Sequence, residues 1–222
     1  PDERPTFDEI VDLLKNDSDF ITELIECNEF LDYADSIEEP ENEQISSTKR
    51  SFQKDFVRSK KKNKKKNFAH QENFLDLSKF SYNKDEPIYR GEFAKIVKIV
   101  DKQTGVFYAA KISNFEMEDL SESDSVNLSR EVNILSKLNH PSIMKFIGYS
   151  PYNFKKEPKP VIVTEFLPFG SLEKVLTKKK KNENLNWNNT KKLINIYGIA
   201  HSMAYLHSNQ ILHRDLKPSN IL

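Results

Sequence analysis

The chain has 222 residues, of which 37% are hydrophobic and 31% are charged, as in a folded protein that also contains linker segments. Its formal net charge is zero, yet residues 1–43 contain sixteen Asp and Glu against two Lys and Arg, and residues 58–66 contain seven basic residues in nine. The single cysteine, Cys27, excludes an internal disulfide, and no stretch has the roughly eighteen apolar residues of a membrane helix, so we expect an intracellular protein, cytoplasmic with the nucleus left open.

The first predicted element is a helix over residues 5–15, PTFDEIVDLLK. Thr6 can cap its first turn, and Glu9 stands three residues later, where it can complete a capping box. The apolar residues at helical spacing are Phe7, Ile10, Val11 and Leu14. A second short helix is predicted within residues 19–31, with the apolar members Phe20, Leu24, Ile25 and Leu31. Two helices of this size cannot bury a core alone, so we expect them to belong to a larger domain.

Residues 38–79 are interpreted as a linker, because the sequence turns polar and loses its periodicity there. The basic run RSKKKNKKK at 58–66 could contact nucleic acid or anionic lipid. No aromatic residue interleaves this run, and base stacking needs aromatic side chains. The favoured interpretation is therefore a solvated linker rather than a nucleic-acid or lipid contact.

Strands are predicted from Phe80 onward. IYRGEFAKIVKIV and VFYAAKI predict an antiparallel hairpin whose turn, DKQTG, ends at Gly105. After a helix at 122–138, the segments SIMKFIGY and PVIVTEF predict two more strands, because they are short and β-branched. We expect the core of this sheet around Ile96, Val97, Leu135, Ile147 and Val163.

A long helix is predicted at 188–207. Its apolar residues recur at intervals of three and four: Leu193, Ile196, Tyr197, Ala200, Met203, Ala204 and His207. The predicted order is therefore three strands, a helix, two strands and then helices.

Four short motifs follow one another in these residues: AAK at 109–111, REVNIL at 130–135, PVIVTEFLPFGSL at 160–172 and HRDLKPSN at 213–220. In this order they make residues 88–222 resemble the first half of a eukaryotic protein kinase domain, closest to its tyrosine-kinase-like serine/threonine group. The resemblance implies an α+β, protein-kinase-like fold. It would consist of an antiparallel five-stranded N-lobe and the first helices of a helical C-lobe, truncated after the catalytic loop.

Lys111 matches the third-strand lysine of the family, and Glu131 matches the helix glutamate that pairs with it. By this resemblance, Lys111 would hold the α- and β-phosphates of ATP, and a buried ion pair with Glu131 would position it. Alone, each could be an ordinary surface residue. Their place among the other motifs favours the functional interpretation.

The segment PVIVTEFLPFGSL resembles the strand and hinge that join the two lobes in the family. Thr164 would be the gatekeeper, and Glu165 and Leu167 would offer backbone groups to the adenine edge. Ile96 and Ala109 would enclose the adenine ring. Positions in the core of a strand would explain these two residues equally well.

The strongest signal is HRDLKPSN. By the resemblance, Asp215 would accept or orient the proton of the substrate hydroxyl, Lys217 would neutralise charge on the transferred phosphoryl group, and Asn220 would bind Mg²⁺. A lysine two positions after the aspartate is the serine/threonine pattern. His213 and Arg214 are expected to be structural supports.

IYRGEFAKI aligns with the glycine-rich phosphate loop but departs from its pattern. Ile88 takes the leading hydrophobic position and Gly91 the second glycine, whereas Tyr89 and Ala94 replace the first and third. A tyrosine lacks the freedom of glycine to take a positive φ and could narrow the approach of the backbone to the phosphates. This departure raises the alternative of a pseudokinase.

The opening PDERPTFDEIVDLL resembles the end of a kinase helical lobe, where an arginine in an R-P-T-F run pairs with a glutamate that follows the activation loop. Arg4 matches that arginine. We therefore predict C-terminal helices of a preceding kinase-like domain at 1–37, a linker at 38–79 and a kinase domain at 80–222. The alternative is a free helix pair with a chance RPTF.

The resemblance implies transfer of the γ-phosphoryl group of ATP, with Mg²⁺, to serine or threonine hydroxyls of protein substrates. We expect this chain to be an internal piece of a longer tandem protein, inactive alone because the Asp-Phe-Gly metal ligand is missing, and the long helix to lack partners for its apolar stripe.

A pseudokinase or scaffold that binds partners without catalysis is the alternative. The altered glycine loop favours it, and five intact residues disfavour it: Lys111, Glu131, Asp215, Lys217 and Asn220. A basic nucleic-acid or membrane binder would rest only on residues 58–66.

Overall fold

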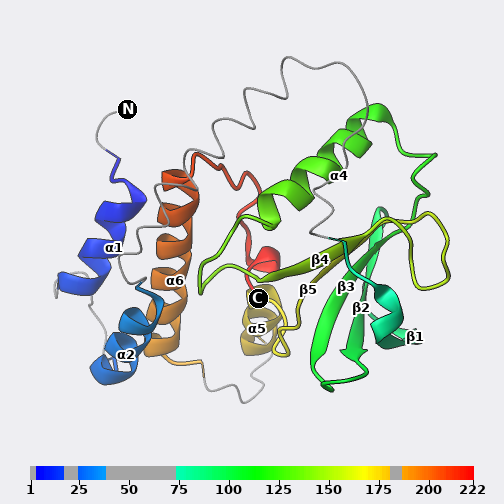
Figure 1. The fold of residues 1–222 in the computed structure, drawn as a ribbon. Coiled ribbons are helices and arrows are strands. Elements are labelled where there is room, and N and C mark those ends of the chain that lie inside the picture. Colours follow the sequence, from blue (N-terminus) through cyan, green and yellow to red (C-terminus); the bar gives the residue numbers. More distant parts are fainter. Residues whose placement is uncertain (1–3, 18–24, 39–73, 181–186) are drawn as a thin grey trace. The chain divides into compact units, whose positions relative to one another are not determined.

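The computed structural model (Figure 1) describes four ranges of the chain: 4–17, 25–38, 74–180 and 187–222. These residues fall into two compact units. The sheet unit consists of the described residues within 63–139 and 144–168. The helical unit consists of those within 1–62, 140–143 and 169–222. The basic run and most of the predicted linker lie outside the described residues. None of the helices in the described ranges is long and apolar enough to span a membrane.

The sheet unit contains a five-stranded antiparallel sheet with the strand order β1-β2-β3-β5-β4. Its strands are β1 (Phe80–Arg90), β2 (Ala94–Asp101), β3 (Phe107–Ser113), β4 (Phe146–Ser150) and β5 (Val161–Glu165). Helix α4 (Glu122–Leu135) lies in the chain between β3 and β4. The predicted order of elements and the predicted five-stranded antiparallel sheet are confirmed.

The turn between β2 and β3 shows why the hairpin forms where the sequence predicts it. The Asp101 carboxylate accepts hydrogen bonds from the backbone N–H groups of Gln103 and Thr104, both at 2.8 Å. Gly105 takes a φ of 72°, which glycine adopts without the steric cost of a Cβ. With the turn closed, Ile96 of β2 lies opposite Lys111 of β3.

The two faces of the sheet bury different clusters, because successive residues of a strand point to opposite faces. Ala110 and Ile112 of β3 lie in the main core of the unit. The other face packs against α4 through a second cluster of Val132, Tyr149 and Ile162. Four predicted core residues belong to these clusters or pack against them: Val97, Leu135, Ile147 and Val163.

The folded part of the sheet unit begins before Phe80. The backbone N–H of Leu75 donates to the carbonyl of Tyr149 at 2.7 Å, and Phe74 forms a parallel bridge with the same residue. Leu77, in the short 3-10 helix η3 (Leu77–Lys79), is buried in the main core. The end of the predicted linker therefore belongs to this unit, because its apolar residues pack against the sheet.

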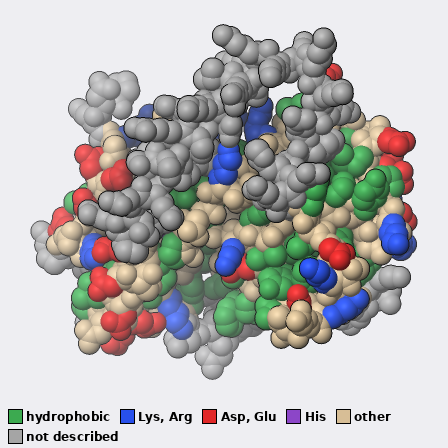
Figure 2. Space-filling view, viewed as in Figure 1, with side chains coloured by type: hydrophobic (Ala, Val, Ile, Leu, Met, Phe, Trp, Pro, Cys, Tyr) green, Lys and Arg blue, Asp and Glu red, His purple; other side chains and the backbone are tan. Residues whose placement is uncertain are grey.

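Four α-helices occur in the described residues of the helical unit: α1 (Phe7–Asn16), α2 (Cys27–Ile37), α5 (Leu172–Lys180) and α6 (Asn189–Ser208). The predicted capping box of α1 is confirmed, since the N–H of Glu9 donates to the Thr6 hydroxyl at 3.2 Å and the N–H of Thr6 donates to the Glu9 carboxylate at 2.6 Å. Both α1 and α2 pack against α6. Acidic side chains gather on the surface over α1 and α2 (Figure 2).

The core between α1, α2 and α6 corrects three sequence predictions. We expected the apolar stripe of α6 to lack partners, but Tyr197 is fully buried and its ring meets that of Phe30 edge-on, with centroids 5.3 Å apart. Leu31 and Ile196, which were expected on the buried faces, are 41% and 52% exposed, because this contact sets the rotation of both helices. The second helix begins only at Cys27, and Phe20 and Leu24 of its predicted apolar set lie outside the described residues.

A histidine pair attaches residues 140–143, from the connection between α4 and β4, to the helical unit. His140 Nε2 lies 2.7 Å from His201 Nδ1 on α6, and the Ser142 N–H donates to His140 Nδ1 at 3.0 Å. The Nε2 atom of His140 therefore carries the hydrogen and donates a hydrogen bond to Nδ1 of His201. Burial of the ring, and secondly the neighbouring His201, lower the pKa of His140 to about 4.

Phe30→Ala should destabilise the helical unit by roughly 3–4 kcal/mol, because it leaves a cavity in the core beside Tyr197. Leu31→Ala, on the exposed side of the same helix, is the matched control and should cost less than about 1 kcal/mol. Denaturant titrations followed by circular dichroism measure both. Equal losses would show that α2 does not bury Phe30.

The histidine pair predicts a pH dependence of stability. Because the pKa of His140 is lowered from 6.5 to about 4 by folding, the unfolded chain takes up this proton first as the pH falls. The free energy of unfolding should therefore decrease by roughly 2–3 kcal/mol between those two pH values on account of this residue. His140→Asn, which keeps an acceptor for the Ser142 N–H, should flatten the pH profile. Parallel profiles for the wild type and His140→Asn would refute the assignment.

Candidate active site

Lys111 of β3 and Glu131 of α4 form the ion pair that the sequence predicts, with Nζ and Oε1 2.7 Å apart. Lys111 alternates with Ala110 and Ile112 of the main core, so it lies on the opposite face of the sheet, where α4 packs. The expectation of a buried pair is wrong, because the two side chains are 48% and 41% exposed. An ion pair this exposed contributes little to the stability of the fold. Its effect is to fix the position of the Lys111 ammonium group.

Three further predicted residues share the face of the sheet that carries Lys111. Ile96 lies directly opposite Lys111 across β2 and β3, and Thr164 lies opposite Ala109 across β3 and β5. Directly opposite residues of neighbouring strands point to the same face. The structure therefore brings apolar and small side chains together on the face that carries this ammonium group, an arrangement that suits a flat ring with attached phosphates.

The backbone after β5 offers hydrogen-bonding groups to a ligand. The N–H of Glu165 already donates to the Lys145 carbonyl at 3.0 Å, and its carbonyl oxygen accepts from the Thr164 hydroxyl at 3.3 Å. The second lone pair of that oxygen is the backbone group that Glu165 can offer. Among the described residues, the N–H and C=O of Leu167 have no hydrogen-bond partner. Leu167 thus presents one donor and one acceptor side by side, which is what the edge of an adenine ring requires.

The loop between β1 and β2 accommodates the tyrosine that replaces its first glycine. The N–H of Gly91 donates to the Ala94 carbonyl at 2.9 Å and closes the turn. A Cβ on Gly91 would lie 2.8 Å from Cε1 of Tyr89, so a larger residue at this position would displace the tyrosine ring. Tyr89 itself does not take a positive φ, so the backbone at this position does not need the conformational freedom of the glycine that it replaces. Ile88, expected beside the nucleotide, lies at a register shift of β1 and is 43% exposed.

Asn114, which directly follows β3, contacts this loop and was not found from the sequence. Its backbone N–H donates to the Phe93 carbonyl at 3.0 Å. Its side-chain Nδ2 donates to the carbonyls of Gly91 at 2.9 Å and Glu92 at 2.8 Å. The acceptors are backbone atoms, which leave no motif. The available signal was an asparagine three positions after Lys111, just beyond the strand.

Asp215, Lys217 and Asn220 form a compact cluster in the helical unit. Lys217 Nζ lies 2.9 Å from Asp215 Oδ2, and Asn220 Nδ2 donates to the same oxygen at 2.9 Å and to the Asp215 carbonyl at 2.8 Å. The short 3-10 helix η4 (Pro218–Asn220) turns the chain so that Asn220 returns to the aspartate. Lys217 first, and then Asn220, lower the pKa of Asp215, which therefore stays ionised at neutral pH.

The two residues before this cluster fix its backbone. His213 Nδ1 accepts the N–H of Asp215 at 3.3 Å. Arg214 takes a left-handed φ of 65°, which a residue with a side chain adopts at an energetic cost. The aspartate thus follows a strained turn that the neighbouring contacts hold in place.

A magnesium ion fits the free oxygen of Asn220. Within the described residues its Oδ1 has no hydrogen-bond partner, and Mg²⁺ prefers oxygen ligands. The same residues contain no group of three His, Cys, Asp or Glu side chains that could form a metal cage. Mg²⁺ usually keeps several waters and binds substrate phosphates as well, so a dedicated protein cage is not required for it.

The structure distributes the predicted site residues over both units. The sheet unit contains Ile88, Gly91, Ile96, Ala109, Lys111, Glu131, Glu165 and Leu167. The helical unit contains Asp215, Lys217 and Asn220. The first set offers groups for a nucleotide, and the second offers a carboxylate, a cation and an amide for a hydroxyl and a metal.

The sheet with its lysine–glutamate pair and the aspartate cluster after α6 are the features of a protein kinase domain. The family model of that domain matches residues 82–222, and the chain belongs to the protein kinase family. It is 34% identical over 142 residues to a Dictyostelium discoideum protein named a probable serine/threonine-protein kinase, an alignment that covers 64% of this chain and 26% of the relative.

Two other relatives are similarly distant. The chain is 31% identical over 149 residues to an Aurora kinase of Saccharomyces cerevisiae, covering 67% of this chain and 38% of the relative. It is 34% identical over 147 residues to a calcium/calmodulin-dependent protein kinase type II of Caenorhabditis elegans, covering 65% and 19%. The aligned part thus spans less than half the length of each of these relatives.

Lys217→Ala and Asn220→Ala should each raise the pKa of Asp215 toward its ordinary value of 3.8, because each removes a hydrogen bond to the ionised carboxylate. Lys217→Ala should have the larger effect, because Lys217 is the larger cause of the shift. The carboxyl ¹³C chemical shift of Asp215, followed through an acid titration, reports this pKa. Lys217→Arg, which keeps a cation, is the control and should preserve most of the shift.

Proposed function

We propose that this sequence belongs to a protein serine/threonine kinase that transfers the γ-phosphoryl group of ATP, with Mg²⁺, to hydroxyl groups of protein substrates. The observation that carries the proposal is the cluster of Asp215, Lys217 and Asn220, in a chain whose residues 82–222 match the protein kinase domain. The lysine two positions after the aspartate and the name of the Dictyostelium discoideum relative support serine/threonine specificity. Membership of the tyrosine-kinase-like group stays a prediction.

Asp215 would orient the substrate hydroxyl rather than act as a strong base. A carboxylate whose pKa is lowered takes up a proton weakly, and Lys217 and Asn220 both lower this pKa. The side chain is 63% exposed, so a hydroxyl of a protein substrate can reach it. Lys217 Nζ, 2.9 Å from the same carboxylate, would face the phosphoryl oxygens as the hydroxyl approaches.

The residues of the sheet unit would bind the nucleotide. Lys111, positioned by Glu131, would contact the phosphates, and the free N–H and C=O of Leu167 would contact adenine. Asn220 would hold Mg²⁺ through Oδ1. When bound, the ion would neutralise phosphate charge and fix the geometry of the nucleotide.

We further propose that residues 1–37 derive from the end of a preceding kinase-like domain, as the RPTF run with Arg4 suggests. In this chain α1 and α2 share a core with α6. Whatever their origin, they therefore complete the helical unit here.

Asp215→Asn should lower phosphoryl transfer by at least about 100-fold, because the amide cannot orient or accept the hydroxyl proton as a carboxylate does. The assay uses the complete protein that contains this sequence, radiolabelled ATP, Mg²⁺ and a generic protein substrate, followed by phosphoamino-acid analysis. Asp119→Asn is the matched control, since Asp119 is an exposed carboxylate outside both residue sets. Label should appear on serine or threonine.

A pseudokinase or scaffold is the second candidate, favoured by the tyrosine in the glycine loop. It predicts that the wild type binds protein partners but transfers no phosphate. Transfer that survives Asp215→Asn would place the chemistry elsewhere in the complete protein and would refute the role of this cluster.

A further inference from the structure

We propose that Asn114 is a positioning residue of the β1–β2 loop, and that it turns the loop peptides so that their N–H groups can bind phosphate. The proposal rests on nucleotide binding by the sheet unit, as proposed above. Its basis is that three consecutive loop carbonyls, those of Gly91, Glu92 and Phe93, all accept hydrogen bonds from this one residue.

The direction of the loop N–H groups follows from the planar peptide. In a trans peptide the C=O and N–H bonds point in opposite directions. Asn114 draws the carbonyls of Gly91 and Glu92 toward its side chain, so the N–H groups of Glu92 and Phe93 are turned away from it. Neither N–H has a partner among the described residues. Two successive free N–H groups are the donors that an anion-binding loop presents to a phosphate.

The chemistry of the contact requires an amide. The facing atoms are carbonyl oxygens, which only accept, so the side-chain atom that meets them is the NH₂ group and donates to both. A carboxylate of the same shape could not donate and would repel the two oxygens. These hydrogen bonds therefore require the amide of asparagine, and another side chain of the same size could not replace it.

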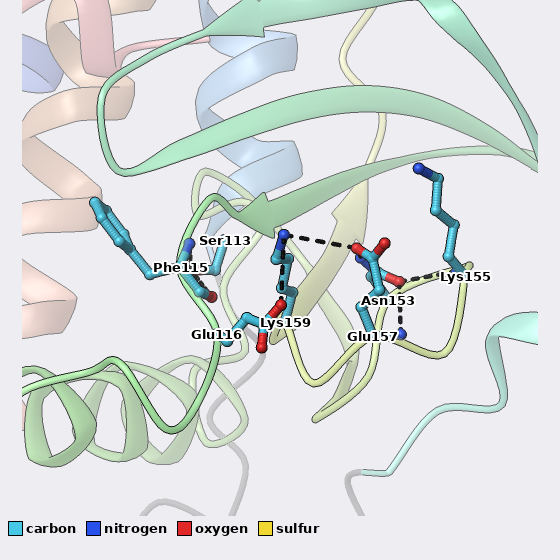
Figure 3. A network of polar contacts seen from close by, with 7 residues as sticks. All are labelled: Ser113, Phe115, Glu116, Asn153, Lys155, Glu157 and Lys159. Atoms are coloured by element: carbon cyan, nitrogen blue, oxygen red, sulfur yellow. Dashed lines mark hydrogen bonds and ion pairs between the residues drawn. The ribbon is translucent and has the colours of Figure 1, made fainter.

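Asn114 can act as an anchor because the segment around it is attached to the connection between β4 and β5 (Figure 3). The N–H of Ser113 donates to the Pro160 carbonyl at 2.9 Å, and the Ser113 hydroxyl donates to the Phe115 carbonyl at 2.9 Å. The N–H of Met117 donates to the Pro158 carbonyl at 2.7 Å. The backbone is thus held on both sides of Asn114.

Charged and polar side chains extend the same attachment. Figure 3 shows Lys159 between two carboxylates, with Nζ 3.9 Å from Glu116 and 3.6 Å from Glu157. Glu157 in turn accepts a hydrogen bond from Asn153 at 2.8 Å, and Asn153 lowers the pKa of its carboxyl group. Each exposed contact is weak, but together they join the segment after β3 to a second part of the sheet unit.

The consequence for binding is preorganisation. A loop that already holds its peptide groups in the binding orientation loses less conformational freedom when a ligand arrives. Lys111 lies on β3, which ends at Ser113 directly before Asn114, so the strand that carries the ammonium group also positions the residue that holds the loop. We infer that affinity for the phosphates of a nucleotide depends on Asn114 although its side chain need not touch them.

Two variants test this in the 222-residue chain. Asn114→Ala removes the two side-chain bonds, and Asn114→Asp keeps the shape but removes the donors. Both should raise the Kd for ATP with Mg²⁺ about tenfold, the equivalent of roughly one net hydrogen bond. Amide hydrogen exchange at Gly91 and at residue 114 should accelerate about tenfold in the same variants, because their N–H groups bond within the restrained loop. Gln103→Glu is the matched control, the same amide-to-carboxylate change in the exposed β2–β3 turn.

The two readouts separate the possible failures. If the wild type binds no ATP with Mg²⁺, the proposed nucleotide site and this proposal both fail. If the wild type binds and Asn114→Ala binds equally well, nucleotide binding stands and the positioning role is overturned, even where exchange accelerates. Unchanged exchange at Gly91 in both variants would also overturn it. A loss of affinity in Asn114→Asp alone would assign the effect to the added charge and refute positioning.

Discussion

The backbone of β3 is hydrogen-bonded on both edges, to β2 on one side and β5 on the other, and this constraint sets the positions of the residues in the sheet unit that carry chemistry. A slip of one residue would bring Lys111 into the main core in place of Ala110 or Ile112, and an unpaired buried cation is costly. The apolar core therefore fixes the register that places the lysine beside α4. The same register sets Asn114 at the end of the strand.

The charged groups of the candidate site are held by backbone structure more than by their mutual attraction. Lys111 and Glu131 are about half exposed, and so are Asp215 and Lys217, where water weakens each ion pair. Their geometry comes from β3, α4 and the turn that ends in η4. Stability and chemistry are thus separable in this protein: stability depends on residues such as Phe30 and Val97, and the site groups stay accessible to ligands.

The sequence predicts the local elements well and the tertiary contacts poorly. Capping at Thr6, the turn at Gly105 and the motif around Asp215 depend on neighbouring residues, and the structure contains all three elements. The second helix and the exposed side of α6 were misjudged because Phe30 and Tyr197 meet only in the folded unit. The exposure of the Lys111–Glu131 pair and the contacts of Asn114 likewise depend on distant backbone, which no periodicity or spacing encodes.

The altered glycine loop is compatible with nucleotide binding on physical grounds. Glycines serve where a positive φ or a close approach of the backbone is needed, and Tyr89 requires no positive φ here. Gly91 remains a glycine, and its missing Cβ leaves room for the tyrosine ring. With Asn114 fixing the loop carbonyls, the orientation of the N–H groups no longer depends on flexible glycines on either side. Tyr89 and Ala94 in place of two glycines are therefore weak evidence for a domain that has lost its nucleotide.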